Sequence, residues 1–144
     1  MKTILMAEDS AEDALLLRRL VKRVGLNARL EIVPDGVEAL AYLKGEGEYA
    51  DRERFPFPDL TLLDIKMPRK TGLEVLAEVR DDPRFTKLLV VFLTSSDELS
   101  DINQAFSLHA NSYVTKTANL HSQEQLIRKL EEYWLLLNKC PTCE

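Results

Sequence analysis

The sequence is poor in cysteine, histidine and tryptophan, and the few that are present do not form a recognisable metal or disulfide framework. Its 144 residues include two cysteines, two histidines and one tryptophan. Both cysteines, Cys140 and Cys143, lie in the last five residues, CPTCE, and His109 and His121 are not spaced as a second pair of zinc ligands. We therefore expect residues 138–144 to form a frayed tail without function, with adventitious metal binding or a disulfide as the alternative.

Long apolar runs and an excess of positive charge are also missing. No apolar run approaches the roughly 20 residues that span a membrane, and the first residues, MKTILMAED, become acidic too soon for a signal peptide. The 19 Lys and Arg are outnumbered by 24 Asp and Glu, which gives a formal net charge of −5. Nucleic-acid-binding modules normally present a basic face. These shortages predict a cytoplasmic protein that binds neither nucleic acid nor membranes.

Short apolar segments alternate with segments of helical pattern along the chain. Hydrophobic residues make up 45% of the sequence, enough for the core of one domain. Strands are expected over residues 3–7, 30–33, 59–64, 88–93 and 112–115. Helices are expected over residues 11–24, 36–43, 71–80, 97–109 and 122–137. The capping signals are Ser10, Asp35, Thr71 and Ser122, each followed three positions later by an acidic or amide residue.

The strict alternation of strands and helices predicts the fold class. It indicates an α/β, flavodoxin-like, doubly wound sheet of five parallel strands in the order 2-1-3-4-5, with five helices on its two faces. A single domain is expected over residues 1–137. Residues 45–58 are polar and rich in turn formers, and are expected to form a long loop between a helix and a strand.

Charged or hydroxyl side chains lie at the end of, or directly after, four of the five expected strands. Glu8 and Asp9 follow the first, Asp64 ends the third, Thr94 follows the fourth and Lys116 follows the fifth. In a doubly wound sheet these strand ends meet at one edge. Three carboxylates there would repel one another, and Mg²⁺ would relieve the repulsion. A hydroxyl and an ammonium supply what a phosphoryl group needs, with Asp64 as nucleophile.

Each of these residues has a simpler explanation when it is taken alone. Glu8 and Asp9 suit the solvated start of a helix, and Asp64 suits a turn. Thr94 suits a helix cap, and Lys116 suits an ordinary surface position. The combination argues for a site, because simple chance rarely places all four chemical types at the right strand ends.

Four segments carry a resemblance to a known family. AED at 7–9, LLDIKMPRKTG at 62–72, LTSSD at 93–97 and YVTK at 113–116 resemble the response-regulator receiver domain of two-component signalling, in order and spacing, over nearly the whole chain. The resemblance implies that Asp64 accepts a phosphoryl group from a sensor histidine kinase.

The same resemblance assigns roles to the surrounding residues. It implies that Mg²⁺, or Mn²⁺ as a substitute, is held by Glu8, Asp9, Asp64 and the backbone carbonyl of Lys66. It implies that Thr94 and Lys116 contact the phosphoryl group. Tyr113 matches the aromatic residue that switches with Thr94, and a plain core tyrosine is the alternative.

Two positions depart from the family pattern. The acidic pair is Glu8-Asp9 where Asp-Asp is commoner, and Thr117 follows Lys116 where the family usually has a proline with a cis peptide. A cis bond before a residue other than proline costs about 3 kcal/mol, so the loop at 116–119 is expected to differ in shape or mobility. The conformation of the Lys116–Thr117 peptide is left open.

The segments outside the four receiver motifs indicate how such a protein would pass on its signal and which partners it would bind. We expect a stand-alone response regulator that signals by partner binding or phosphorelay, with no enzymatic activity beyond its own phosphorylation and dephosphorylation. The loop at 45–58 and the Tyr133-Trp134 pair near the chain end resemble receivers paired with phytochrome-type histidine kinases. The apolar run 133–137 covers more than one helix face, which suggests a homodimer through the last helix.

Three other functions compete with this interpretation. A magnesium-dependent phosphatase with an Asp nucleophile needs a second Asp two residues later, where this chain has Lys66. A flavin-binding protein of the same fold needs a phosphate-binding loop after the first strand, where this chain has Glu8 and Asp9. A receiver-like scaffold that acts without phosphorylation is the third alternative.

Overall fold

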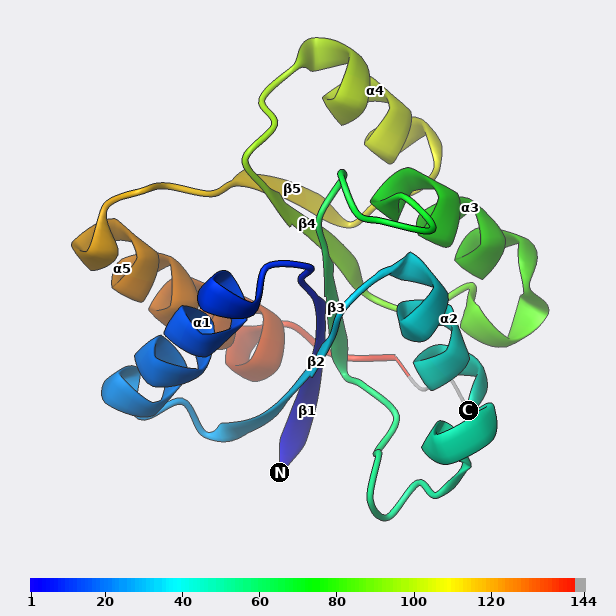
Figure 1. Ribbon diagram of the computed structural model, residues 1–144, viewed down its shortest axis with the longest axis horizontal. Helices are drawn as coiled ribbons and strands as arrows, with labels where there is room; N and C mark the ends of the chain where they lie inside the picture. The colour runs from blue at the N-terminus through cyan, green and yellow to red at the C-terminus, as the bar shows by residue number, and fades with distance from the viewer. Residues whose placement is uncertain (142–144) are drawn as a thin grey trace.

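Five parallel strands form one sheet in the order β2-β1-β3-β4-β5 in the computed structural model, which describes residues 1–141 (Figure 1). The strands are β1 (Lys2–Ala7), β2 (Ala28–Val33), β3 (Leu60–Leu63), β4 (Val90–Thr94) and β5 (Ser112–Thr115). Strand β1, which lies next to the edge strand β2, pairs with β2 along its whole length and with the central strand β3 over Ile4 to Met6. The expected strand order is confirmed.

Helices cover both faces of the sheet. They are α1 (Ala11–Val24), α2 (Gly36–Lys44), α3 (Gly72–Asp81), α4 (Leu99–Ser107) and α5 (Leu120–Leu130). In Figure 1, α1 and α5 lie on one side of the sheet, and α2, α3 and α4 lie on the other. Short 3₁₀ turns occur at Gly47–Ala50 (η1) and Pro83–Phe85 (η2), and α5 continues into a π-helical segment at Glu131–Leu137 (η3).

The alternation of side chains along β1 divides the core into two layers. Ile4 and Met6 belong to the cluster that includes Leu130 of α5, whereas Leu5 and Ala7 belong to the cluster on the α2 and α3 side. All four are less than 5% exposed. The unbroken apolar run from Ile4 to Ala7 in β1 is thus explained by helices on both faces.

The capping signals predict three helix starts correctly and one wrongly. The side chains of Ser10, Asp35 and Thr71 each accept a hydrogen bond from the backbone N–H three residues later. Ser122 was expected to begin the last helix, but its N–H instead donates to the side chain of Asn119, and α5 begins at Leu120. Asn119 is an equally good cap, and its signal lies three residues earlier in the same polar stretch.

Residues 45–58 form the expected connection from α2 to β3, with η1 as its only regular element, and aromatic packing orders it. Tyr49 and Phe55 pack against the ring of Tyr42. The Arg52 guanidinium donates to the carbonyls of Tyr42 and Leu43 at the end of α2, at 2.8 and 2.9 Å. Arg52 thereby satisfies carbonyls that the last turn of α2 leaves without helical partners.

The chain end is apolar and folds back on the sheet. Trp134 and Cys140 pack against the core cluster that contains Ile4, Met6 and Leu130. The Lys2 ammonium lies 3.5 Å from the Cys140 sulfur. Cys140 is a free thiol; the prediction for Cys143 falls outside the described residues. No helix within residues 1–141 is both long and apolar enough to cross a membrane.

Candidate functional site

The carboxyl ends of β1, β3, β4 and β5 meet around one polar cavity of about 460 Å³. Its lining includes Glu8, Asp9, Asp64, Thr94 and Lys116, the residues expected from the sequence. Glu8, Asp64 and Thr94 are buried, Lys116 is half-buried and Asp9 is exposed. Segments that are far apart in the chain therefore supply one site, as the strand order requires.

Asp64 stands at the centre of this site with both carboxylate oxygens engaged. The Thr94 hydroxyl donates to Oδ1 at 2.6 Å, and the Lys116 ammonium donates to Oδ2 at 3.1 Å. A fixed hydroxyl and a fixed cation around one carboxylate are the two donor types that stabilise added negative charge there. The Asp64 side chain is 12% exposed, so it remains within reach of a small donor molecule.

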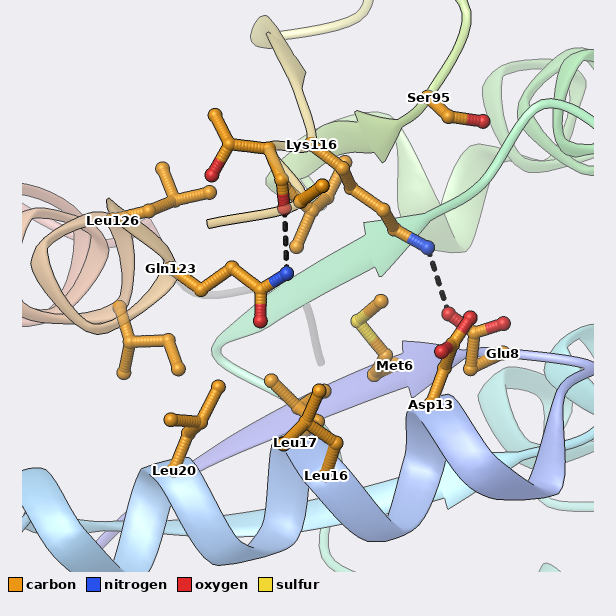
Figure 2. Close-up of a pocket in the computed structure, with 14 residues that line it drawn as sticks. Met6, Glu8, Asp13, Leu16, Leu17, Leu20, Ser95, Lys116, Gln123 and Leu126 are labelled. Atoms are coloured by element: carbon orange, nitrogen blue, oxygen red, sulfur yellow. Dashed lines mark hydrogen bonds and ion pairs between the residues drawn. The ribbon is translucent and has the colours of Figure 1, made fainter. Parts of the chain in front are cut away.

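Lys116 joins two carboxylates from different strands. Its Nζ lies 2.7 Å from Oε1 of Glu8, as well as near Asp64, and Figure 2 shows the ammonium pointing toward Glu8. Burial lowers the pKa of Lys116, but the hydrogen bond that its ammonium donates to Glu8 and the charge of Asp64 outweigh this effect, and the pKa is raised. The lysine is therefore held as a cation, which partly neutralises the two buried carboxylates.

A second, apolar cavity of about 310 Å³ lies beside the first, between α1 and α5 (Figure 2). Four residues line both cavities: Glu8, Asp13, Ser95 and Lys116. On its far side Gln123 of α5 donates to the Thr117 carbonyl at 2.5 Å. Residues 1–141 contain no cis peptide bond, so the Lys116–Thr117 peptide is trans.

The expected metal ligands surround the polar cavity but do not converge in this structure. Within residues 1–141 no group of three Asp, Glu, His or Cys side chains is close enough to hold a metal ion, and Glu8 is paired with Lys116. The donor set still fits a hard cation in its chemistry, since Glu8, Asp9 and Asp64 offer carboxylate oxygens to the cavity that Lys66 also lines.

A chain of hydrogen bonds runs from Asp64 to α4 and β5. The Thr94 hydroxyl accepts from the Ser96 backbone N–H at 3.3 Å, and the Ser96 hydroxyl donates to Asp101 of α4 at 2.6 Å. Tyr113 donates its hydroxyl to the Ser96 carbonyl at 2.8 Å, and burial raises the pKa of Tyr113. No motif in the sequence indicated the role of Ser96 between these elements.

Comparison with known proteins decides the family. The family model of the response regulator receiver domain matches residues 4–131. This chain belongs to the response-regulator receiver family. As a receiver it has a signalling role and a histidine kinase as its class of partner.

Similar receivers include regulators associated with phytochromes. Response regulator Rcp1 of Synechocystis sp. is 39% identical over 134 residues, which cover 93% of this chain and 89% of Rcp1. The solved structure of the phosphorylated cyanobacterial phytochrome response regulator RcpA is 40% identical, with a TM-score of 0.88, over 98% of this chain and 99% of that one. The Mn²⁺-bound form of Rcp1 is 37% identical, with a TM-score of 0.86, over 99% and 100%.

Proposed function

We propose that this receiver accepts a phosphoryl group on Asp64 from a sensor histidine kinase. The observation that carries the proposal is the environment of the Asp64 carboxylate, which is held by the Thr94 hydroxyl on one oxygen and the Lys116 ammonium on the other. The similarity to a phosphorylated regulator, RcpA, supports the same function.

The transfer is a substitution at phosphorus. An Asp64 carboxylate oxygen forms the new P–O bond, while the P–N bond to the kinase histidine breaks and the imidazole keeps the electron pair. The product is an aspartyl phosphate, which water later hydrolyses. Lys116 and Thr94 each turn one donor from the carboxylate to the phosphoryl oxygens, so that charge gained at the site is matched by donors already in place.

Mg²⁺ is the proposed cofactor, with Mn²⁺ as a substitute. Glu8, Asp9, Asp64 and the backbone carbonyl of Lys66 would hold the ion, with water in the remaining positions. When bound, it supplies positive charge against the transferring phosphoryl group. A solved Mn²⁺ complex of the relative Rcp1 supports this assignment. Glu8 must turn from Lys116 to bind the ion directly, or else bind it through water.

The proposed output is a shift of the β4–α4–β5 surface. An aspartyl phosphate carries about −1.5 to −2 charges where the carboxylate carried −1, a net gain of about half to one negative charge. The Thr94 hydroxyl would leave Asp64 Oδ1 for the phosphoryl group, which alters its contact with the Ser96 N–H. Because Ser96 also binds Asp101 and Tyr113, the change reaches both α4 and the proposed switch residue, Tyr113.

We further propose a stand-alone cytoplasmic regulator, with residues 1–137 as its receiver domain and a phytochrome-type kinase as its phosphodonor. The similarity to Rcp1 and RcpA extends over nearly the whole length of each. It supports both the stand-alone architecture and the phytochrome-type kinase as phosphodonor.

A homodimer is proposed through the end of α5 and η3. Tyr133, Leu136 and Leu137 are 52%, 69% and 64% exposed, while Leu135 between them is buried in the core. Three large exposed apolar side chains within five residues form a patch that a second copy of the chain can cover.

Intact-protein mass spectrometry tests the central proposal. Incubation with acetyl phosphate and Mg²⁺ is expected to add one phosphoryl group to the wild type and none to Asp64→Asn. Asp97→Asn, which alters another carboxylate of the same cavity, is expected to retain the gain. A gain in Asp64→Asn equal to that of the wild type would place the acceptor elsewhere, and no gain in any variant would contradict phospho-acceptance from small donors.

A further inference from the structure

The loop that follows Asp64 contains a backbone conformation that needs explanation. Arg69 has φ of 68°, in the left-handed region that residues other than glycine rarely adopt. The Lys70 N–H donates to the Pro68 carbonyl at 2.7 Å, so Arg69 is the central residue of a γ-turn. Strained backbone of this kind persists when the surrounding structure holds it, and it gathers at functional sites.

An ion pair from another element holds Arg69 in place. Its Nη1 lies 3.1 Å from Oδ2 of Asp35, whose side chain is 8% exposed. The other oxygen of Asp35, Oδ1, accepts the Glu38 N–H at 2.8 Å and so caps α2. One buried carboxylate thus joins the start of α2 to the loop after Asp64, using a different oxygen for each.

Close backbone packing reinforces this junction. A Cβ on Gly36, the first residue of α2, would lie 2.3 Å from the Lys70 carbonyl oxygen. At the other end of the loop, the Gly72 N–H donates to the Ile65 carbonyl at 3.0 Å. The loop is therefore closed on itself by a backbone hydrogen bond and lies in close contact with the start of α2.

We propose that Arg69 and Asp35 are a positioning pair for phosphoryl transfer. By fixing the γ-turn against α2, the pair holds the segment 64–70 so that the Asp64 carboxylate and the Lys66 carbonyl keep their places at the polar cavity. Neither residue lines that cavity, so they act through the loop. This inference rests on the proposed function of Asp64.

Conservative variants separate the ion pair from the other roles of these residues. Asp35→Asn keeps an oxygen to cap α2 but removes the charge that Arg69 binds. Arg69→Gly accepts the left-handed φ without strain but lacks the guanidinium. Arg69→Lys keeps a cation. Glu78→Gln is the matched control, because it breaks the Lys70–Glu78 ion pair (2.8 Å) of the same loop on its exposed side.

The first readout is the initial rate of phosphorylation by acetyl phosphate per folded protein. It is expected to fall about tenfold in Asp35→Asn and Arg69→Gly and no further in the double variant, because the two residues act as one unit. Arg69→Lys and Glu78→Gln are expected to stay within about threefold of wild type, on the scale of weak exposed ion pairs.

The second readout, amide hydrogen exchange at Lys70 and Gly72, depends on neither phosphate nor metal. It is expected to accelerate in the two slowed variants and not in Glu78→Gln. A normal rate in Arg69→Gly, or faster exchange with a normal rate, would overturn the proposal. If the wild type itself gained no phosphoryl group, the proposed function would fail, and unchanged exchange in Asp35→Asn would still refute the pair's hold on the loop.

Discussion

The Lys116 ammonium offsets the negative charge of two buried carboxylates. It pairs with Glu8 and Asp64, whose side chains are only 4% and 12% exposed. Without the lysine, two carboxylates so close together and so little exposed to solvent would repel each other. The lysine and a bound cation therefore serve the same carboxylates, and each can partly replace the other in stabilising the fold.

Replacing Lys116 tests this exchange. Lys116→Gln is expected to lose about 2 kcal/mol of unfolding free energy in metal-free buffer, less than a fully buried pair because the lysine is 24% exposed. Mn²⁺ is expected to stabilise the variant more than the wild type. Thermal melts with and without Mn²⁺ measure both effects. Lys70→Gln, from an exposed ion pair, serves as the control, and an equal response to Mn²⁺ in Lys116→Gln and wild type would contradict the argument.

Tyr42 makes stability depend on pH at the alkaline end. Burial, followed by the charge of Glu31, raises the pKa of Tyr42 to about 12. A folded pKa above the unfolded value of about 10 means that its contribution is full below pH 10 and is lost as the pH rises toward 12.

Tyr42→Phe is therefore expected to flatten the fall in stability between pH 10 and 12. At neutral pH it should cost about 1 kcal/mol, because the Tyr42 hydroxyl no longer donates to the Pro56 carbonyl. Urea unfolding at pH 7, 10 and 11.5 measures both changes. Tyr133→Phe, at an exposed tyrosine, should keep the wild-type profile, and an unaltered slope in Tyr42→Phe would count against the assignment.

At the scale of the elements, the start of α3 sets the position of Asp64. A Cβ on Gly72 would lie 2.0 Å from the Asp64 carbonyl oxygen and 2.9 Å from the Phe92 ring. Such an approach is shorter than any tolerated contact, so α3 or the end of β3 must move when a side chain is added there. The glycine of the segment LLDIKMPRKTG is thus explained by packing against the backbone of Asp64.

Gly72→Ala is expected to destabilise the protein by about 3 kcal/mol, at the upper end of overpacking, and to slow phosphorylation of Asp64 in the molecules that remain folded. Gly25→Ala is the control, because Gly25 has a φ of 70° and nothing near its would-be Cβ. That variant should pay only the cost of the left-handed backbone, about 1–2 kcal/mol, with a normal rate. Equal effects of the two changes on the rate would refute the steric explanation.

The elements also show which features a sequence can predict. Strand order followed from the alternation of apolar and amphipathic segments, and three caps followed from local signals. The true start of α5 did not, because Asn119 and Ser122 are both good caps and tertiary contacts choose between them. The ordered aromatic packing of residues 45–58 was missed for a similar reason, since Arg52 and Phe55 meet Tyr42 only after the chain folds.

The features of the site also divide into those that the sequence predicts and those that it does not. Residue types at strand ends predicted which side chains meet, because topology alone brings those ends together. The preference of Glu8 for Lys116, the bridging role of Ser96 and the Arg69–Asp35 pair depend on rotamers and loop geometry. No spacing or motif carries that information.

At the scale of the whole molecule, the chain presents two contrasting ends. The polar cavity lies at the carboxyl edge of the sheet, and the apolar patch of Tyr133, Leu136 and Leu137 follows α5. The Trp134 side chain and Leu135 turn into the core, which fixes the patch on a packed base. A patch supported in this way suits a stable contact better than a loose tail does.

The double variant Leu136→Glu/Leu137→Glu tests the proposed homodimer. It is expected to reduce the mass measured by light scattering from that of a dimer to that of a monomer of 16.5 kDa, because four glutamates would face one another across a two-fold interface. Since both leucines are exposed, the far-ultraviolet circular dichroism spectrum should not change. Leu99→Glu is the matched control: Leu99 is 70% exposed but lies on α4, so this variant should remain a dimer. A wild type that is monomeric at every concentration, with and without phosphorylation, would refute the dimer. Dissociation by Leu99→Glu alone would move the interface to α4.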